Sequence, residues 1–188
     1  MKLSESYRKH VFCLEGDWDK DLRNKSSILA ALDFMQTNCF VKYIHRACGT
    51  KNNLFYYLNQ WSLKKYKDYS ICYLAFHGQP GYLQVGKEEV TLEEIAERLE
   101  GKCNDKIIHL GSCLVLDVDP DRIKEFITKT KALCVCGFQT EIDFLESSVL
   151  DMLVIDLLQE YKDVKKVERE LKKNYGKILK RLNFKIFY

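Results

Sequence analysis

The sequence predicts an α/β fold built on a mostly parallel sheet. Short apolar runs alternate with amphipathic runs along the 188 residues, and strands that alternate with helices form parallel sheets with helices on both sides. The strongest strand signal, Tyr69–Phe76, is almost continuously apolar, as in a parallel strand that is buried on both faces. Two prolines and nine glycines leave little room for linkers, so we expect a single domain over residues 1–188.

The first third of the chain predicts two pairs of a strand and a helix. We expect strands at His10–Leu14 and Cys39–His45, and helices at Ile28–Gln36 and Leu54–Tyr66. Ser26 or Ser27 would cap the first helix, because a serine hydroxyl accepts one of the free N–H groups at a helix start. Gly49–Asn53 is expected to form the turn before the second helix.

The middle of the chain predicts a buried strand, a hairpin and a short helix. We expect strands at Tyr69–Phe76, Tyr82–Val85 and Glu89–Thr91, and a helix at Leu92–Leu99. Gly86 and Lys87 stand between the second and third of these strands, which favours a hairpin. Thr91 and Glu94 have the spacing of a capping box, which predicts where the helix begins.

The last part predicts three more strands and three more helices. We expect strands at Lys106–Leu110, Ala132–Val135 and Phe184–Phe187, and helices at 120–130, 142–161 and 164–183. Asp119 and Pro120 suit a helix start, since proline is tolerated in the first turn. Phe184–Phe187 would be a final edge strand.

The C-terminal helix is expected to be amphipathic and basic. Its apolar residues recur at steps of three or four, at Val164, Val167, Leu171, Tyr175, Ile178 and Leu182. Residues 161–188 carry ten Lys or Arg and three Asp or Glu, a local charge of +7 in a chain whose net charge is +3. Such a segment fits nucleic acid or an acidic surface. We interpret residues 162–183 instead as a helix with a solvated basic face, and expect no nucleic-acid partner.

The cysteine usage predicts reduced thiols. Four of the eight cysteines lie in apolar, strand-like runs, where a thiol behaves as a small hydrophobe: Cys13, Cys72, Cys134 and Cys136. The N-terminus MKLSESYRKH has no apolar signal core, and there is no run of about 18 apolar residues that could span a membrane. We therefore expect a cytoplasmic protein without a membrane partner.

A histidine and a cysteine follow two consecutive strands of the predicted sheet. His77 follows Tyr69–Phe76, and Cys113 follows Lys106–Leu110. Ligands bind at the carboxyl ends of parallel strands, and an imidazole there can take the proton of a thiol and return it to a leaving amine. The N–H groups of Gly78 and Cys113 would face a developing oxyanion.

These two blocks resemble the caspase-like cysteine peptidases (clan CD), which include caspases, metacaspases, gingipains, separase and CHAT-type peptidases. The matching segments are Ile71–Gly78, a hydrophobic strand ending in His-Gly, and Ile107–Cys113, a hydrophobic strand ending in small-small-Cys. Cys134–Phe138 followed by Ile142–Phe144 is similar to the strand and helix after the cysteine in CHAT-type members. The resemblance implies a caspase-like three-layer α/β/α sandwich, with His77 as general base and acid and Cys113 as nucleophile.

The chain also departs from the caspase pattern. Caspases have Gln-Ala-Cys-x-Gly around the nucleophile, whereas this chain has Gly111-Ser112-Cys113-Leu114, which argues against aspartate specificity. There is no cleavable linker between a large and a small subunit, which argues against activation by processing. The CHAT-type resemblance implies a regulated bacterial role, such as phage defence, with a polypeptide substrate and an activating or regulated protein partner. The edge strand Phe184–Phe187 would allow a homodimer of the caspase type.

Acidic and aromatic residues near the same sheet edge are candidates for substrate binding. Glu15, Asp17 and Trp18 follow the first strand, and Glu141 and Asp143 follow the fifth. Carboxylates there would favour a basic residue before the scissile bond. The alternatives are that these residues cap helices or are solvated, and that Glu15 or Asp17 orients His77.

Other sites are not favoured by the sequence. His109 lies in the middle of a strand and is expected in the core. No CxxC or HxxxH set accompanies His109 and Cys113, so we expect no zinc. Cys134 and Cys136 lie two residues apart on one strand face, which indicates packing. Neither a GxGxxG nor a GxxxxGK[ST] motif is present, so we expect no cofactor.

Three hypotheses therefore remain open. The first is a cysteine endopeptidase that works through an acyl-enzyme. The second is a catalytically inactive caspase-like scaffold or interaction module, which would use its basic C-terminal helix, because a fold does not determine a function. The third is an unrelated doubly wound domain, such as a flavodoxin-like or receiver domain.

Overall fold

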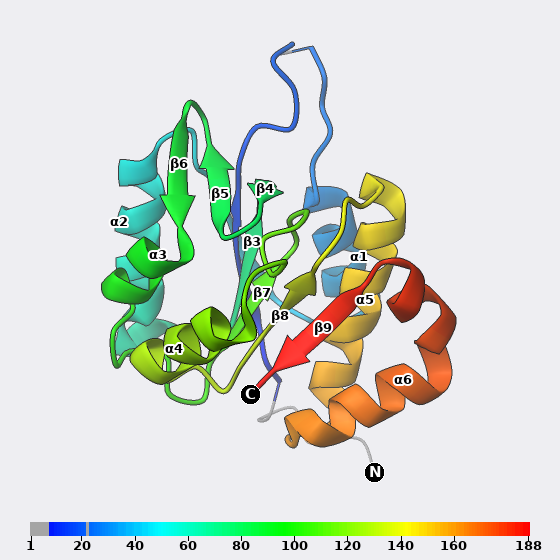
Figure 1. The fold of residues 1–188 in the computed structure, drawn as a ribbon. Helices are drawn as coiled ribbons and strands as arrows, with labels where there is room; N and C mark the ends of the chain where they lie inside the picture. The colour runs from blue at the N-terminus through cyan, green and yellow to red at the C-terminus, as the bar shows by residue number, and fades with distance from the viewer. Residues whose placement is uncertain (1–7, 22) are drawn as a thin grey trace.

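A six-stranded sheet runs through the computed structural model, which describes residues 8–21 and 23–188 (Figure 1). The strand order is β2-β1-β3-β7-β8-β9, in which β9 pairs antiparallel and every other neighbouring pair is parallel. The strands are β1 Val11–Glu15, β2 Tyr43–Ala47, β3 Ile71–Ala75, β7 Ile107–Leu110, β8 Cys134–Phe138 and β9 Phe184–Phe187. The predicted α/β class with a mostly parallel sheet is confirmed, and so is the final edge strand.

Helices cover both faces of this sheet (Figure 1). The helices on one face are α2 Lys51–Ser62, α3 Leu92–Arg98 and α4 Pro120–Thr130, and those on the other are α1 Leu29–Cys39, α5 Phe144–Glu160 and α6 Val164–Arg181. The strands are buried on both sides because alternate residues point to opposite cores. In β3, for example, Cys72 and Leu74 belong to the core under α2, whereas Ile71 and Tyr73 belong to the core under α5.

A small antiparallel sheet follows β3 directly. It consists of β4 His77–Gln79, β5 Tyr82–Val85 and β6 Glu88–Thr91. The hairpin of β5 and β6 around Gly86 was predicted and is confirmed, whereas β4 was not predicted. His77 therefore begins a strand and does not lie in a loop, and its backbone is held by pairing with Gln84.

Two of the predicted helix starts are confirmed in detail. Thr91 and Glu94 form the capping box at the start of α3, and Asp119 caps α4 with Pro120 at its first position. At the start of α1 the hydroxyl of Ser27 accepts the Leu29 N–H, as the predicted serine cap requires, although the assigned helix begins at Leu29 with Ile28 before it.

The other differences are shifts at element ends. The predicted turn at 49–53 is wrong, because the Thr50 side chain accepts the Asn53 N–H and starts α2 at Lys51. Likewise β2 begins at Tyr43, since α1 extends to Cys39 and ends on Phe40, which has a left-handed φ of 58°.

All eight cysteines, which lie within the described residues, are free, and six of them are buried. No helix of the described residues is long and apolar enough to cross a membrane. The prediction that no signal sequence is present rests partly on residues 1–7, which lie outside the described residues.

Candidate active site

The segments that carry His77 and Cys113 leave the sheet side by side. β3 and β7 are adjacent and parallel, with Leu74 opposite Leu110. His77 follows Leu74 by three residues, and Cys113 follows Leu110 by three. The two candidate catalytic residues therefore stand at equivalent positions past the carboxyl edge of neighbouring strands, where the sequence placed them.

Ser112 joins the two segments through its side chain. Its hydroxyl oxygen accepts the N–H of Phe76 and donates to the carbonyl of Leu74, both at 3.2 Å. Ser112 is 1% exposed, so these bonds are not exchanged with water. The turn before Cys113 is thereby attached to the end of the strand that carries His77.

Gly78 brings the two backbones into contact. A Cβ atom at this position would lie 2.3 Å from the Cys113 carbonyl oxygen and 2.4 Å from Cγ2 of Val115. Only glycine permits so close an approach. On the other side, Leu114 adopts a left-handed φ of 59°, a conformation that costs free energy for a residue with a side chain and is concentrated at functional sites.

The His77 ring is oriented by Trp18. Its Nε2 lies 3.0 Å from the Trp18 carbonyl oxygen, and the two rings are in edge contact with centroids 5.3 Å apart. A carbonyl only accepts hydrogen bonds, so Nε2 carries the proton. In the neutral ring Nδ1 then holds the free lone pair, which is the form that a general base needs.

The Cys113 thiol is one of two that are not buried; the other is Cys39. Burial raises the pKa of the Cys48 and Cys103 thiols to about 12 and also raises the pKa of Cys39, which keeps these groups protonated. The Sγ of Cys113 lies 3.9 Å from the Ile142 carbonyl oxygen.

Within the described residues His77 and Cys113 are not hydrogen-bonded to each other. The imidazole bonds the Trp18 carbonyl and the thiol points to the Ile142 carbonyl. The Trp18 ring contacts the rings of both His77 and Phe144, and Phe144 lies two residues after Ile142 in the chain.

A comparison with protein families matches residues 8–188 to one family model. The chain belongs to DUF6642, a family of unknown function. A comparison with the curated proteins finds no match.

Glu15 of this DUF6642 chain is held inside the fold and does not line the surface as a free carboxylate. It is 4% exposed, and its oxygens accept four hydrogen bonds of 2.6–2.8 Å, from Trp18 Nε1, Ser27 Oγ, the Ile28 N–H and His45 Nε2. Burial alone raises the pKa of this carboxyl, but the hydrogen bonds outweigh burial and lower the pKa below its usual value. Glu15 thereby fixes Trp18, whose carbonyl in turn orients His77. Glu15 also lines the hollow that follows β1, and its contact with substrate stays a prediction.

The other predicted substrate-binding residues of the DUF6642 chain have different contacts and different exposure. Trp18 contacts His77 directly. Asp143 caps α5 by accepting the N–H groups of Leu145 and Glu146, so the alternative role as a helix cap is confirmed for it. Asp17 and Glu141 are exposed on the loops after β1 and β8, and their contact with substrate stays a prediction.

The loop after β1 forms a hollow that the sequence analysis did not identify. Asp17, Asp19 and Asp21, together with Trp18 and His45, line a cavity of about 250 Å³. Asp19 and Asp21 accept hydrogen bonds within the loop, from Asn24 and Arg23 among others, which lower the pKa of both carboxyls. The sequence signal that could have indicated this hollow is the alternation of aspartates at positions 17, 19 and 21.

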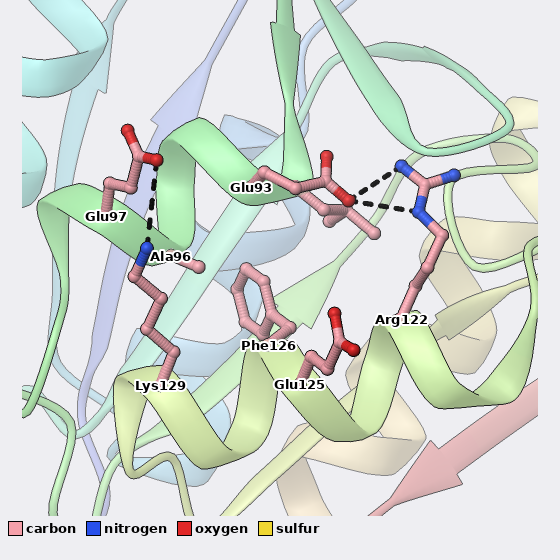
Figure 2. Close-up of a pocket in the computed structure, with 8 residues that line it drawn as sticks. Glu93, Ala96, Glu97, Arg122, Glu125, Phe126 and Lys129 are labelled. Carbon is pink, nitrogen blue, oxygen red and sulfur yellow. Dashed lines mark hydrogen bonds and ion pairs between the residues drawn. The ribbon is translucent and has the colours of Figure 1, made fainter.

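A second hollow lies between α3 and α4 and holds none of the predicted site residues (Figure 2). Its walls are joined by two ion pairs, from Arg122 to Glu93 at 2.8 Å and from Lys129 to Glu97 at 3.7 Å, which lie on either side of Phe126 (Figure 2). Among residues 8–21 and 23–188, no three His, Cys, Asp or Glu side chains gather as metal ligands.

Proposed function

We propose that the chain is a cysteine endopeptidase of the caspase-like type, with Cys113 as nucleophile and His77 as general base and acid. One observation carries the proposal: Gly78 lies against the Cys113 carbonyl, and Ser112 bonds both sides of the junction. A thiol and an imidazole on adjacent strand ends are the two groups that acyl transfer by a cysteine requires.

In the proposed reaction the lone pair on His77 Nδ1 takes the proton of the Cys113 thiol. The thiolate attacks the peptide carbonyl carbon, and the negative oxygen of the tetrahedral intermediate accepts N–H groups from Gly78 and Cys113. Within the described residues no acceptor takes the N–H of Cys113, which leaves it available. The imidazolium then gives its proton to the leaving amine, and water releases the acyl group from sulfur.

Trp18 supports this sequence of proton transfers. Its carbonyl accepts the His77 Nε2 proton at 3.0 Å, which leaves the lone pair on Nδ1 free to act as a base and stabilises the imidazolium. A buried carboxylate has this function in the serine peptidases. Here Glu15 acts one step away, through its 2.6 Å bond to the indole N–H of Trp18.

The thiol must turn from Ile142 toward His77 before the reaction. Its present bond to the Ile142 carbonyl is long, at 3.9 Å, and a thiol is a weak donor. Rotation about χ1 therefore costs little. Catalytic hydrogen bonds are often absent in the free enzyme and form when substrate binds.

A catalytically inactive scaffold is the second candidate. The observation that favours it is the absence, within the described residues, of a hydrogen bond between the thiol and the imidazole. Either protein would function in the cytoplasm, where the eight free thiols would stay reduced. Its partners would be a polypeptide and, by resemblance to CHAT-type peptidases, a protein of a regulated bacterial pathway such as phage defence.

Cleavage of a diverse peptide library, read by mass spectrometry of the new termini, separates the two candidates. The wild-type chain is compared with Cys113→Ala and with His77→Ala, in the presence of reductant. The endopeptidase predicts internal cleavage by the wild type and none by either variant. Cleavage that persists in Cys113→Ala, or a wild type that cleaves nothing, would favour the scaffold.

A further inference from the structure

A polar network lies in the core directly beneath the candidate site. Asp151, from α5, accepts the hydroxyl proton of Tyr73 at 2.5 Å and a ring N–H of His109 at 2.6 Å. The other nitrogen of His109 lies 3.5 Å from the sulfur of Cys136. Tyr73 is opposite His109 in the sheet, and His109 is opposite Cys136. The Asp151 carboxylate thus connects α5 directly to β3 and β7, and His109 extends the connection to β8. The three strand residues are neighbours across the sheet.

No solvent reaches this network. Asp151 and Tyr73 are 2% exposed and His109 is 0% exposed, so no substrate can reach the Cys136 thiol. A buried carboxylate is tolerated only where hydrogen bonds compensate for lost hydration, and apolar residues of the same volume often give equal or greater stability. Burial and the charge of Asp151 raise the pKa of Tyr73, which keeps its hydroxyl protonated as a donor.

The network reaches the candidate site through Tyr73. A Cβ atom on Gly111 would lie 2.2 Å from Cε2 of Tyr73 and 2.7 Å from its hydroxyl oxygen, so the tyrosine lies against the backbone two residues before Cys113. Tyr73 also precedes His77 by four residues, and His109 precedes Cys113 by four. The two strands that Asp151 joins are therefore the two that carry the candidate pair.

We propose that Asp151 is a positioning residue that sets the distance between the His77 and Cys113 segments. It holds Tyr73 and His109 at one separation, and the Tyr73 ring fixes the path of Gly111 into the turn that carries the thiol. This inference rests on the proposed function for its consequence, but the contacts from which it is drawn are independent of any reaction.

The test is the rate of Cys113 alkylation by iodoacetamide between pH 6 and pH 9, resolved by peptide mass mapping. The full chain is compared with Tyr73→Phe, which keeps the ring, with Asp151→Asn, which keeps the shape, and with Thr130→Val. Thr130 is the matched control, because its buried hydroxyl bonds Phe126 and Ala132 at the end of α4. All measurements are made below the thermal transition of each variant.

The inference predicts that Tyr73→Phe and Asp151→Asn each lower the rate at pH 6 about tenfold, because small displacements of reacting groups have large effects on rate. Thr130→Val should leave the rate unchanged although it destabilises the fold. A merely structural role would lower the melting temperature of all three variants and leave the pH profile of Cys113 as in the wild type. That outcome overturns the inference.

A second readout separates this inference from the proposed function. If Cys113 of the wild type reacts as an ordinary thiol and His77→Ala changes nothing, the proposed function fails. The positioning role is then decided by the backbone amide resonances of residues 111–113 in Tyr73→Phe. Chemical-shift changes from the wild type that are well beyond those in Thr130→Val support the positioning role. Unchanged amide resonances of residues 111–113 overturn it.

Discussion

Gly78 occupies a position where a side chain has no space. The atoms that a Cβ would meet are the Cys113 carbonyl oxygen at 2.3 Å and a methyl group of Val115 at 2.4 Å. One is backbone and the other is a buried core atom, so neither can move away without displacing the turn that carries the thiol. At this residue the stability of the fold and the geometry of the candidate site depend on the same contact.

We predict that Gly78→Ala destabilises the chain by about 1–3 kcal/mol, the range for inserting a methyl group into a packed interior. Urea unfolding at neutral pH measures the difference. The control is Gly49→Ala, since nothing lies within 4 Å of a Cβ there. Equal midpoints for the two variants would show that the Gly78 contact is not tight.

Glu15 gives a prediction with a definite sign in pH. Its pKa in the folded chain is lowered, so its contribution to stability is present above the unfolded pKa of about 4.3 and is lost as the pH falls through the folded value. We predict that Glu15→Gln is less stable than the wild type at pH 7, and that the difference shrinks once the pH drops below about 4.3. Urea unfolding at both pH values tests this, and a difference that grows with acid would contradict it.

Sequence reasoning predicted well the positions of residues that directly follow a strand. His77 and Cys113 lie past neighbouring strand ends as predicted, because the carboxyl ends of adjacent parallel strands meet at one edge of the sheet. The burial of Glu15 was not predicted, because burial depends on which other segments pack against a residue. Its hydrogen-bond partners His45 and Ser27 come from other segments of the chain, and no local sequence pattern predicts these bonds. Asp151 and Tyr73 were missed for the same reason.

At the scale of elements, the helix caps decide where the helices begin. Thr91 accepts the Glu94 N–H, and the Glu94 carboxylate accepts the Thr91 N–H at 3.0 Å. α3 starts at Leu92, whose N–H bonds the Gly81 carbonyl, while the Gly81 N–H bonds the Val115 carbonyl. Two consecutive backbone hydrogen bonds therefore connect the start of α3 to the turn that follows Cys113.

We predict that Thr91→Ala costs about 0.5–2 kcal/mol of stability, as for other lost N-caps. Thermal unfolding compared with Thr128→Ala provides the measurement, because Thr128 is an exposed residue inside α4 where alanine is at least as favourable. If the two variants unfold at the same temperature, the capping box contributes nothing.

The element boundaries that sequence reasoning missed have local physical causes. α2 starts three residues before the predicted start at Leu54, because the Thr50 side chain caps the helix by accepting the Asn53 N–H. β4 was missed because three residues give no periodicity, and its pairing with β5 is a contact between segments. By contrast, the long apolar run of β3 and the capping box of α3 are local signals, and both were correct.

At the scale of the whole molecule, β9 closes the sheet on one side. The chain returns antiparallel beside β8, and the Phe184 ring is in edge contact with Phe138 at 5.2 Å and lies near His109 at 5.8 Å. The last strand thus covers the core face that holds the buried network under the candidate site. The C-terminal segment that looked like a simple edge strand contributes to the main core.

We predict that Phe184→Ala destabilises the chain by about 3–5 kcal/mol, the usual cost of removing a buried phenylalanine side chain. Phe34→Ala is the matched control, because Phe34 is 56% exposed on α1 and should cost little. Denaturant unfolding of both variants provides the values. A small loss for Phe184→Ala would mean that β9 is only loosely attached.

The proposed reaction requires one thiol to be paired with one imidazole, and the pH dependence of Cys113 alkylation tests that pairing directly. The rates are measured in the wild type and in His77→Ala, with a free cysteine derivative at the same pH as the reference for an ordinary thiol. We predict that Cys113 reacts faster than the free thiol at pH 6 and loses this advantage without His77. Rates for Cys113 that follow those of the free thiol in both proteins would contradict the pairing.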